Sequence, residues 1–296
     1  MRCWLRVVLV ALVVLILAVV AISAFIGHTL TRAERLSIKD KPGSRGIDYT
    51  EVQFQSSVDA ITLRGWHMMS PDSDRIIIMV HGASDHRASR TVGMLDIAVQ
   101  LLENGYDVLT FDLRGHGESD GNRISGGYFE QRDVLGAVEY VKTLGFHNIG
   151  LLGFSVGAVS SLLAAAQSTD IDALVADSSF ADLNDIVAAE FKKRAHLPAV
   201  FLPPLLLMVK IMYGVDFAEL APAAYVAKIA PRPVFVIHGA LDKMIPANHA
   251  RRLKQAAQGS ADQLWIAPGA AHVRAFATHP REYMQRILAF YDSVWQ

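Results

Sequence analysis

Apolar and polar positions divide most of the chain into segments typical of strands and helices. Residues 51–55 and 61–66 alternate polar and apolar side chains, which indicates an antiparallel pair with one solvated face. Later apolar runs are nearly continuous, as expected for strands buried on both faces of a sheet. These runs are residues 75–80, 108–111, 149–152 and 234–237, with shorter candidates at 173–176 and 264–266.

Segments with helical periodicity separate the apolar runs. They are residues 92–103, 131–143, 156–167, 248–258 and 281–294. Because strands and helices alternate along the chain, the pattern predicts an α/β fold with a mostly parallel sheet.

Residues 182–230 interrupt this alternation. The segment has no strand pattern, is strongly apolar from His196 to Val209, and contains Pro198, Pro203 and Pro204, which interrupt helices. We expect a helical cap insertion at the edge of the sheet. Its apolar character fits a lid over an apolar substrate site or a contact with a bilayer. Helices packed on the core without a substrate role fit equally well.

The N-terminus carries a run of 20 uncharged residues, from Val7 to Ile26. At ~1.5 Å per residue, the run matches a hydrocarbon core of ~30 Å. We therefore expect residues 1–30 to be a single-pass membrane anchor, residues 31–49 a polar linker and residues 50–296 the globular domain. The alternative is a secretory signal peptide cleaved near Ala21 or Ser23, although the apolar core of such peptides is usually only ~7–15 residues long.

The charges beside the apolar run give no clear orientation. Positive residues flank both ends, and taken literally the positive-inside rule leans towards a cytoplasmic domain. A short tail before a single span instead favours an extracytoplasmic domain, which is the orientation we expect. The flanking charges are Arg2 and Arg6 on one side and Arg32, Arg35, Lys39, Lys41 and Arg45 on the other.

Composition excludes several classes of protein. With 52% hydrophobic and 19% charged residues, the chain is not disordered and can bury a large core. The net charge is −1 and no run of Lys and Arg occurs, so nucleic acid is not an expected partner. Cys3 is the only cysteine, which rules out an intrachain disulfide and a cysteine-based metal site.

The sequence Gly153-x-Ser155-x-Gly157 lies between the strand at 149–152 and the helix at 156–167. A serine on a sharp strand-to-helix turn between two glycines is the nucleophile-elbow pattern. The pattern is short and also arises by chance, so an incidental serine in a turn is the alternative.

Two further groups follow buried strands in the loops where ligands bind in open α/β sheets. Asp242 follows the strand at 234–237, and His272 follows the strand at 264–266. The order Ser155, Asp242, His272 is that of α/β-hydrolase triads, with the serine as nucleophile, the histidine as base and the aspartate orienting the histidine. Asp177 is the competing acid, and His279 is the weaker candidate for the base.

The loops after residues 75–80 and 108–111 are expected to support this chemistry. The backbone N–H groups of Ala83 and Val156 are candidates for an oxyanion hole. His81 is expected to brace the first loop rather than to react. In the second loop, we expect Asp112 and Arg114 to form a structural ion pair.

Several of these stretches resemble the α/β-hydrolase superfamily, in particular its serine-aminopeptidase and monoacylglycerol-lipase-like group and the bacterial membrane-anchored members of it. The stretches are His81-Gly82-Ala83-Ser84, residues 112–119, residues 153–157, residues 238–246 and Gly269-Ala270-Ala271-His272. The resemblance implies an α/β-hydrolase fold with an eight-stranded type of sheet and a helical cap. It implies the triad and oxyanion roles given above, with no metal or organic cofactor. Many relatives have His or Glu directly before the nucleophile, where this chain has Phe154. The substrate of a relative therefore cannot be assigned to this chain.

We therefore expect a membrane-tethered serine hydrolase that cleaves acyl esters of small or lipid-like molecules. A serine aminopeptidase is the first alternative, and it would need acidic groups to hold the substrate amine. A non-catalytic binding protein with a hydrolase fold is the second, although such proteins usually lack a triad residue. Candidate acidic groups in the insertion are Asp182, Asp185, Glu190 and Glu219.

Overall fold

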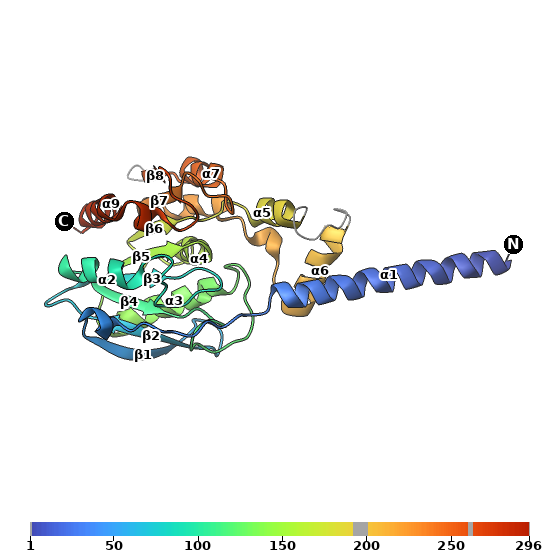
Figure 1. The fold of residues 1–296 in the computed structure, drawn as a ribbon, viewed down its shortest axis with the longest axis horizontal. Helices are drawn as coiled ribbons and strands as arrows, with labels where there is room; N and C mark the ends of the chain where they lie inside the picture. The colour runs from blue at the N-terminus through green and yellow to red at the C-terminus, as the bar shows by residue number, and fades with distance from the viewer. Residues whose placement is uncertain (1, 192–200, 260–262, 296) are drawn as a thin grey trace. The chain divides into compact units, whose positions relative to one another are not determined.

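The computed structural model describes residues 2–191, 201–259 and 263–295 and is drawn in Figure 1. The chain forms two compact units. The smaller comprises Met1–Arg32 and Leu183–Leu220, and the larger comprises Ala33–Asp182 and Ala221–Gln296. Part of the apolar run predicted from His196 to Val209, including Pro198, lies outside the described residues.

The larger unit is built on an eight-stranded sheet with the order β1-β2-β4-β3-β5-β6-β7-β8. β1 pairs antiparallel with β2, and β2 with β4, whereas all the other neighbours are parallel. The predicted α/β fold, antiparallel pair and mostly parallel sheet are thus confirmed. The strands are β1 Tyr49–Gln55, β2 Thr62–Met68, β3 Arg75–Val80, β4 Asp107–Phe111, β5 Asn148–Phe154, β6 Ala173–Asp177, β7 Val234–Gly239 and β8 Gln263–Ala267.

Helices cover both faces of this sheet (Figure 1). Successive side chains of a strand point to opposite faces, so Ile76 and Ile78 of β3 pack in one apolar cluster and Ile77 in the other. The first cluster includes residues of α3, α4 and α7, and the second includes residues of α2 and α9. The helices are α2 Met94–Glu103, α3 Glu130–Thr143, α4 Val156–Ala165, α7 Asn248–Ala256, α8 Ala275–Thr278 and α9 Pro280–Asp292.

The smaller unit joins the N-terminal helix to most of the predicted insertion. It contains α1 Arg2–Leu30, α5 Leu183–Glu190, α6 Leu202–Tyr213 and the 3₁₀ turn η4 Phe217–Glu219, and α6 packs against α1. The insertion continues in the larger unit with the 3₁₀ turns η5 Pro222–Ala224 and η6 Val226–Ile229. In its described part, the insertion is therefore helical and strandless, as its sequence predicts.

One helix of the described residues, Trp4–Leu30, is long and apolar enough to cross a membrane, with a mean hydropathy of 3.3. A retained anchor and a secretory signal both fit this length and composition.

The residues that follow α1 are held by the larger unit. The Arg35 guanidinium donates hydrogen bonds to the carbonyl oxygens of Gly117 (2.9 Å) and Gly121 (2.6 Å). Asp40 forms an ion pair with Arg90 at 2.6 Å. The short turn η1 Pro42–Arg45 then leads into β1. The segment predicted as a linker is thus fixed by polar contacts from Arg35 onwards.

Candidate active site

Ser155 lies on the turn between β5 and α4 in an unusual backbone conformation. Its φ is 52° and its ψ is −118°, a region that non-glycine residues rarely adopt. The flanking glycines are required by space. A Cβ atom on Gly153 would lie 2.6 Å from the Cα atom of Ala158, and one on Gly157 would lie 2.3 Å from the carbonyl oxygen of Val80. The turn therefore has the tight geometry that the glycine spacing predicts.

The structure brings Ser155, His272 and Asp242 together in one hydrogen-bonded chain. The Ser155 hydroxyl lies 3.0 Å from Nε2 of His272, and Nδ1 of His272 lies 2.7 Å from Oδ2 of Asp242. The Asp242 side chain is fully buried, whereas that of His272 is 17% exposed. The imidazole can therefore accept the serine proton at Nε2 while the carboxylate holds Nδ1–H.

Asp242 is surrounded by donors that favour its ionised form. Its Oδ1 accepts the N–H groups of Met244 and Ile245, both at 2.9 Å. Nε2 of His238 lies 3.3 Å from Oδ2. Burial alone would raise the pKa of Asp242, but the hydrogen bonds from His238 and His272 outweigh it and hold the pKa well below its usual value. Asp242 thus presents a full negative charge to His272.

Neither rival residue replaces a member of this chain. Asp177, the last residue of β6, accepts a hydrogen bond from the Ser178 hydroxyl at 2.8 Å, and burial raises the pKa of its carboxyl to about 6. His279 lies at the start of α9, where its Nε2 donates to the carbonyl oxygen of Pro268 at 2.6 Å. The Asp177 carboxyl is thus hydrogen-bonded to Ser178, and His279 to the loop after β8. The hydrogen bond of His272 is to Asp242.

The loop after β3 passes directly beside the serine. A Cβ atom on Gly82 would lie 3.2 Å from Cβ of Ser155 and 3.3 Å from the carbonyl oxygen of Phe154. Ala83 follows in this loop. Val156 is the first residue of α4, so its N–H has no acceptor within the helix. These positions suit the two N–H groups that the sequence predicts as oxyanion donors.

His81 connects this loop to the next one. Its Nδ1–H donates to the carbonyl oxygen of Gly82 (2.7 Å), and its Nε2 accepts the N–H of Leu113 (3.0 Å). Burial lowers the pKa of His81 well below its usual value, so the ring is neutral and matches one donor to one acceptor. This geometry agrees with the expected bracing role.

The predicted ion pair between Asp112 and Arg114 is wrong, because each residue pairs elsewhere. Asp112 binds the Arg87 guanidinium at 2.7 Å and also accepts the N–H groups of Arg87 and Glu118. Arg114 instead binds Asp133 of α3 at 2.7 Å. These three donors occupy the Asp112 carboxylate. The Arg114 side chain points instead towards α3, where it meets Asp133.

Residues 177 and 178 contact both reacting loops, and no local sequence pattern predicts these contacts. The Ser155 N–H donates to the carbonyl oxygen of Asp177 at 2.8 Å. The Val273 N–H, next to His272, donates to the Ser178 hydroxyl at 3.1 Å. Ser178 and Val273 also have positive φ values, 59° and 50°. A serine in a strand-end loop carries no local signal for this role, since its partners are distant in sequence.

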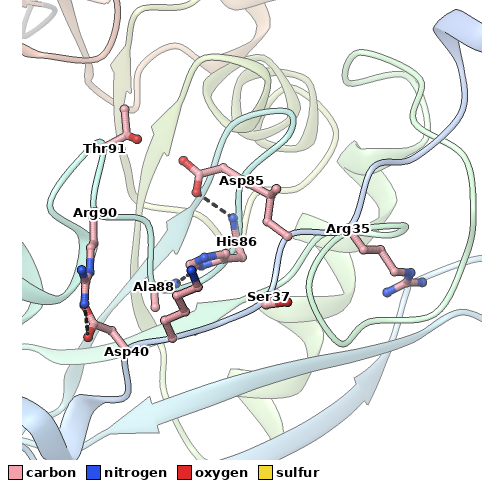
Figure 2. A pocket seen from close by; sticks show the side chains of 10 residues that line it. Arg35, Ser37, Asp40, Asp85, His86, Ala88, Arg90 and Thr91 are labelled. Carbon is pink, nitrogen blue, oxygen red and sulfur yellow. Dashed lines mark hydrogen bonds and ion pairs between the residues drawn. The ribbon is translucent and has the colours of Figure 1, made fainter.

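A separate cavity of about 550 Å³ lies between the segment after α1 and the continuation of the loop after β3 (Figure 2). Figure 2 shows the Arg90–Asp40 ion pair at its edge, with Asp85 and His86 across from it. Its lining residues do not include the Ser155–His272–Asp242 chain. Across the described ranges, His, Asp and Glu side chains nowhere gather in threes that could hold a metal ion.

Comparison with known proteins agrees with this fold. A family profile described as "alpha/beta hydrolase fold" matches residues 75–197. The uncharacterized protein YqkD of Bacillus subtilis is 28% identical over 303 residues, covering 97% of each chain. The uncharacterized membrane protein YNL320W of Saccharomyces cerevisiae is 21% identical over 240 residues, covering 79% of this chain and 76% of its own.

A solved structure extends the likeness over nearly the whole chain. The esterase Pf2001 of Pyrococcus furiosus superposes with a TM-score of 0.74 at 26% identity, covering 88% of this chain and 99% of its own. The profile match lies on the segment that contains β3 to β6 and the Ser155 turn. Together, the profile, the superposition and the sheet show that the chain belongs to the α/β-hydrolase superfamily.

Proposed function

We propose that this protein is a serine hydrolase that cleaves carboxylic esters with Ser155 as nucleophile, His272 as general base and Asp242 as orienting acid. The observation that carries the proposal is the hydrogen-bonded chain from the Ser155 hydroxyl through His272 to Asp242, with distances of 3.0 and 2.7 Å. Nucleophile, base and orienting group within such reach form the arrangement used in acyl transfer.

In the first half of the reaction, Nε2 of His272 takes the Ser155 proton as Oγ attacks the carbonyl carbon. The N–H groups of Ala83 and Val156 stabilise the negative oxygen of the tetrahedral intermediate. His272 then gives its proton to the leaving alcohol as the ester C–O bond breaks. Asp242 stabilises the imidazolium between these two transfers.

In the second half, water attacks the acyl-enzyme with the same assistance. His272 accepts a proton from the water, and the acyl carbon is again tetrahedral. The bond to Oγ breaks, Ser155 regains its proton from His272, and the acid leaves. These steps use side chains and backbone groups of this chain throughout.

A fluorophosphonate probe tests the nucleophile directly. We expect the purified full chain to be labelled, and Ser155→Ala to lose the label. Ser168→Ala, in the loop after α4, is the matched control and should label like the wild type. Absence of labelling, or labelling that persists in Ser155→Ala, would remove the basis of the proposal.

Acyl esters, including lipid-like ones, are the proposed substrate class. The name of the Pyrococcus furiosus esterase and the apolar helix α1 both support this choice. A panel of p-nitrophenyl esters of increasing acyl length, run beside aminoacyl-naphthylamides, separates an esterase from an aminopeptidase. Higher kcat/KM on the amides would reverse the assignment.

We further propose that α1 is a retained single-pass anchor with the larger unit on the extracytoplasmic side. The helix has the length and hydropathy of a span, and the yeast relative carries the name of a membrane protein. Protease added to intact cells should then digest the larger unit. Protection until the cells are lysed would place the unit in the cytoplasm instead.

A further inference from the structure

Within the smaller unit, the last turns of α1 carry a buried stripe of small residues, and the glycine in this stripe contacts α6. Ser23 and Gly27 of α1, and Thr31 just after it, follow at intervals of four and are all buried. A Cβ atom on Gly27 would come 2.8 Å from Cγ2 of Val209 in α6. Small residues at this spacing allow close helix contact and are typical of helix pairs in membranes.

A polar contact extends the pairing beyond this stripe. Nδ1 of His28 is hydrogen-bonded to the Tyr213 hydroxyl at 2.8 Å. Both residues lie where α1 and α6 end. Aromatic residues with a polar tip are enriched at the level of lipid headgroups, so this contact suits the boundary between membrane and water.

The opposite side of α6 is also apolar. Leu205 and Val209 are buried, whereas Leu207 is 55% and Ile211 67% exposed. A helix that is apolar on all sides is ordinarily surrounded by apolar material. Packing on α1 accounts for the burial of Leu205 and Val209. The opposite face, formed by Leu207 and Ile211, needs another apolar neighbour.

The charged residue of α6, Lys210, is compatible with an apolar neighbour. Lys210 forms an ion pair with Asp216 at 2.5 Å, just after the end of α6. A long lysine side chain near a helix end can carry its ammonium group to the interface while its stem stays on apolar surface.

We propose that α6 lies in the membrane interface beside the last turns of α1, with Leu207 and Ile211 against lipid acyl chains. The inference rests on the proposed retention of α1. Exposed Phe25 and Leu30 continue the apolar surface of α1 to the level of α6. If α1 is retained in the membrane, its apolar surface is in contact with lipid, and lipid is therefore the neighbour that we assign to the exposed face of α6.

The length of α1 sets the depth of α6. Residues 7–26 fill a hydrocarbon core of ~30 Å, so Gly27 and His28 lie at the headgroup boundary. Because α6 contacts those two residues, it is a shallow helix rather than a second span. The insertion would then touch the phase in which a lipid-like ester resides.

The single native cysteine makes this depth measurable in the full chain. In a Cys3→Ser background, one cysteine is introduced as Leu207→Cys, Ile211→Cys, Val14→Cys or Val58→Cys and labelled with a nitrobenzoxadiazole fluorophore. The proteins are reconstituted in phosphatidylcholine and phosphatidylglycerol vesicles that carry nitroxide lipids. Val14 reports the middle of α1, and Val58, 73% exposed in the larger unit, is the matched apolar control. Fluorophosphonate labelling of Ser155 verifies that each variant is folded.

We expect the labels at 207 and 211 to lose most of their fluorescence to nitroxides near the headgroup, and less to nitroxides near the acyl-chain end. The label at 14 should show the reverse order, and the label at 58 little loss. Quenching at 14 but not at 207 and 211 would overturn the inference while leaving the anchor intact. Quenching at none of these positions would overturn the anchor itself.

The remaining outcomes identify other neighbours and also overturn the inference. Labels at 207 and 211 that escape both lipid nitroxides and aqueous iodide would indicate a protein surface, such as a second copy of this chain. Labels that iodide quenches freely would indicate water. Equal lipid quenching at 58 would show that the contact is not specific to α6.

Discussion

Asp177 and Asp242 are two buried carboxyl groups at the ends of neighbouring parallel strands, yet their chemistry differs. Asp242 accepts two backbone N–H groups and the His272 ring, and its pKa is held well below the usual value. Asp177 accepts the Ser178 hydroxyl, and burial raises its pKa to about 6. Both carboxyl groups are buried, so the difference in pKa comes from the number and charge of their hydrogen-bond donors. Only the carboxyl with the lowered pKa can stabilise the positive charge of an imidazolium.

The largest difference between the two carboxyl groups should appear in kcat/KM when the charge of each is removed in turn. Asp242→Asn should lower kcat/KM on a p-nitrophenyl ester by about 10⁴-fold, because His272 loses the group that sets its tautomer and stabilises its charge. Asp177→Asn has the same change of shape and charge. It should cost less than about tenfold, because the Asp177 carboxyl is hydrogen-bonded to Ser178, whereas His272 is hydrogen-bonded to Asp242.

Kinetics of the two purified variants, side by side, provide the measurement. A loss in Asp177→Asn as large as that in Asp242→Asn would mean that the two carboxyls share the role.

Stability should respond to pH in opposite directions at the two sites. The folded-state pKa of Asp177 is raised from 3.8 to about 6, so its contribution to stability is complete below about pH 4 and is lost as pH rises through 6. That loss is about 3 kcal/mol. The free energy of unfolding of the wild type should therefore fall relative to that of Asp177→Asn between pH 4 and pH 7.

Urea unfolding in detergent at both pH values measures the difference. For Asp242, whose pKa is lowered, the contribution is present above about pH 4 and declines at lower pH. The free energy of unfolding of the wild type should therefore rise relative to that of Asp242→Asn as pH increases from 3 to 5. This is the opposite of the change expected for Asp177. Parallel pH curves for wild type and Asp177→Asn would contradict the raised pKa.

The smallest expected effect concerns the link between Asp177 and the histidine loop. Ser178→Ala removes the acceptor of the Val273 N–H and the donor to Asp177. A loss of about 1 kcal/mol is usual for such a bond, so kcat should fall roughly five- to tenfold with KM little changed.

Ser179→Ala is the matched control, because Ser179 is equally buried and its hydroxyl donates to the carbonyl oxygen of Phe180 at 3.0 Å. Steady-state kinetics on a p-nitrophenyl ester distinguish the two. Equal losses in both variants would indicate a general packing effect instead of positioning of the His272 loop.

Local patterns sufficed for the strands and for the residues that meet at the sheet edge. Each of the eight apolar or alternating runs corresponds to a strand, because burial on one or two faces leaves a direct imprint on the sequence. Ser155, Asp242 and His272 follow such strands, and parallel strands end at a common edge. Chain order therefore predicted their proximity.

Contacts between distant segments were beyond that reasoning. The wrong pairing of Asp112 with Arg114 arose because the true partners, Arg87 and Asp133, are 25 and 19 residues away. Chain order favoured Asp242 over Asp177, but the N–H groups of Met244 and Ile245 that make the physical difference appear only in the folded turn. The pairing of α1 with α6 likewise left no mark in either segment alone.

The contact between α1 and α6 also sets an order of events during synthesis. His28 and Tyr213 are 185 residues apart. At ribosomal rates of about 5–20 residues per second, α1 precedes its partner by roughly 10–40 s. The nascent chain must thus deliver its first helix alone, with the Gly27 stripe uncovered, and complete the smaller unit only after most of the sheet has been made. Substitutions in that stripe should therefore affect the yield of assembled protein before they affect the finished molecule.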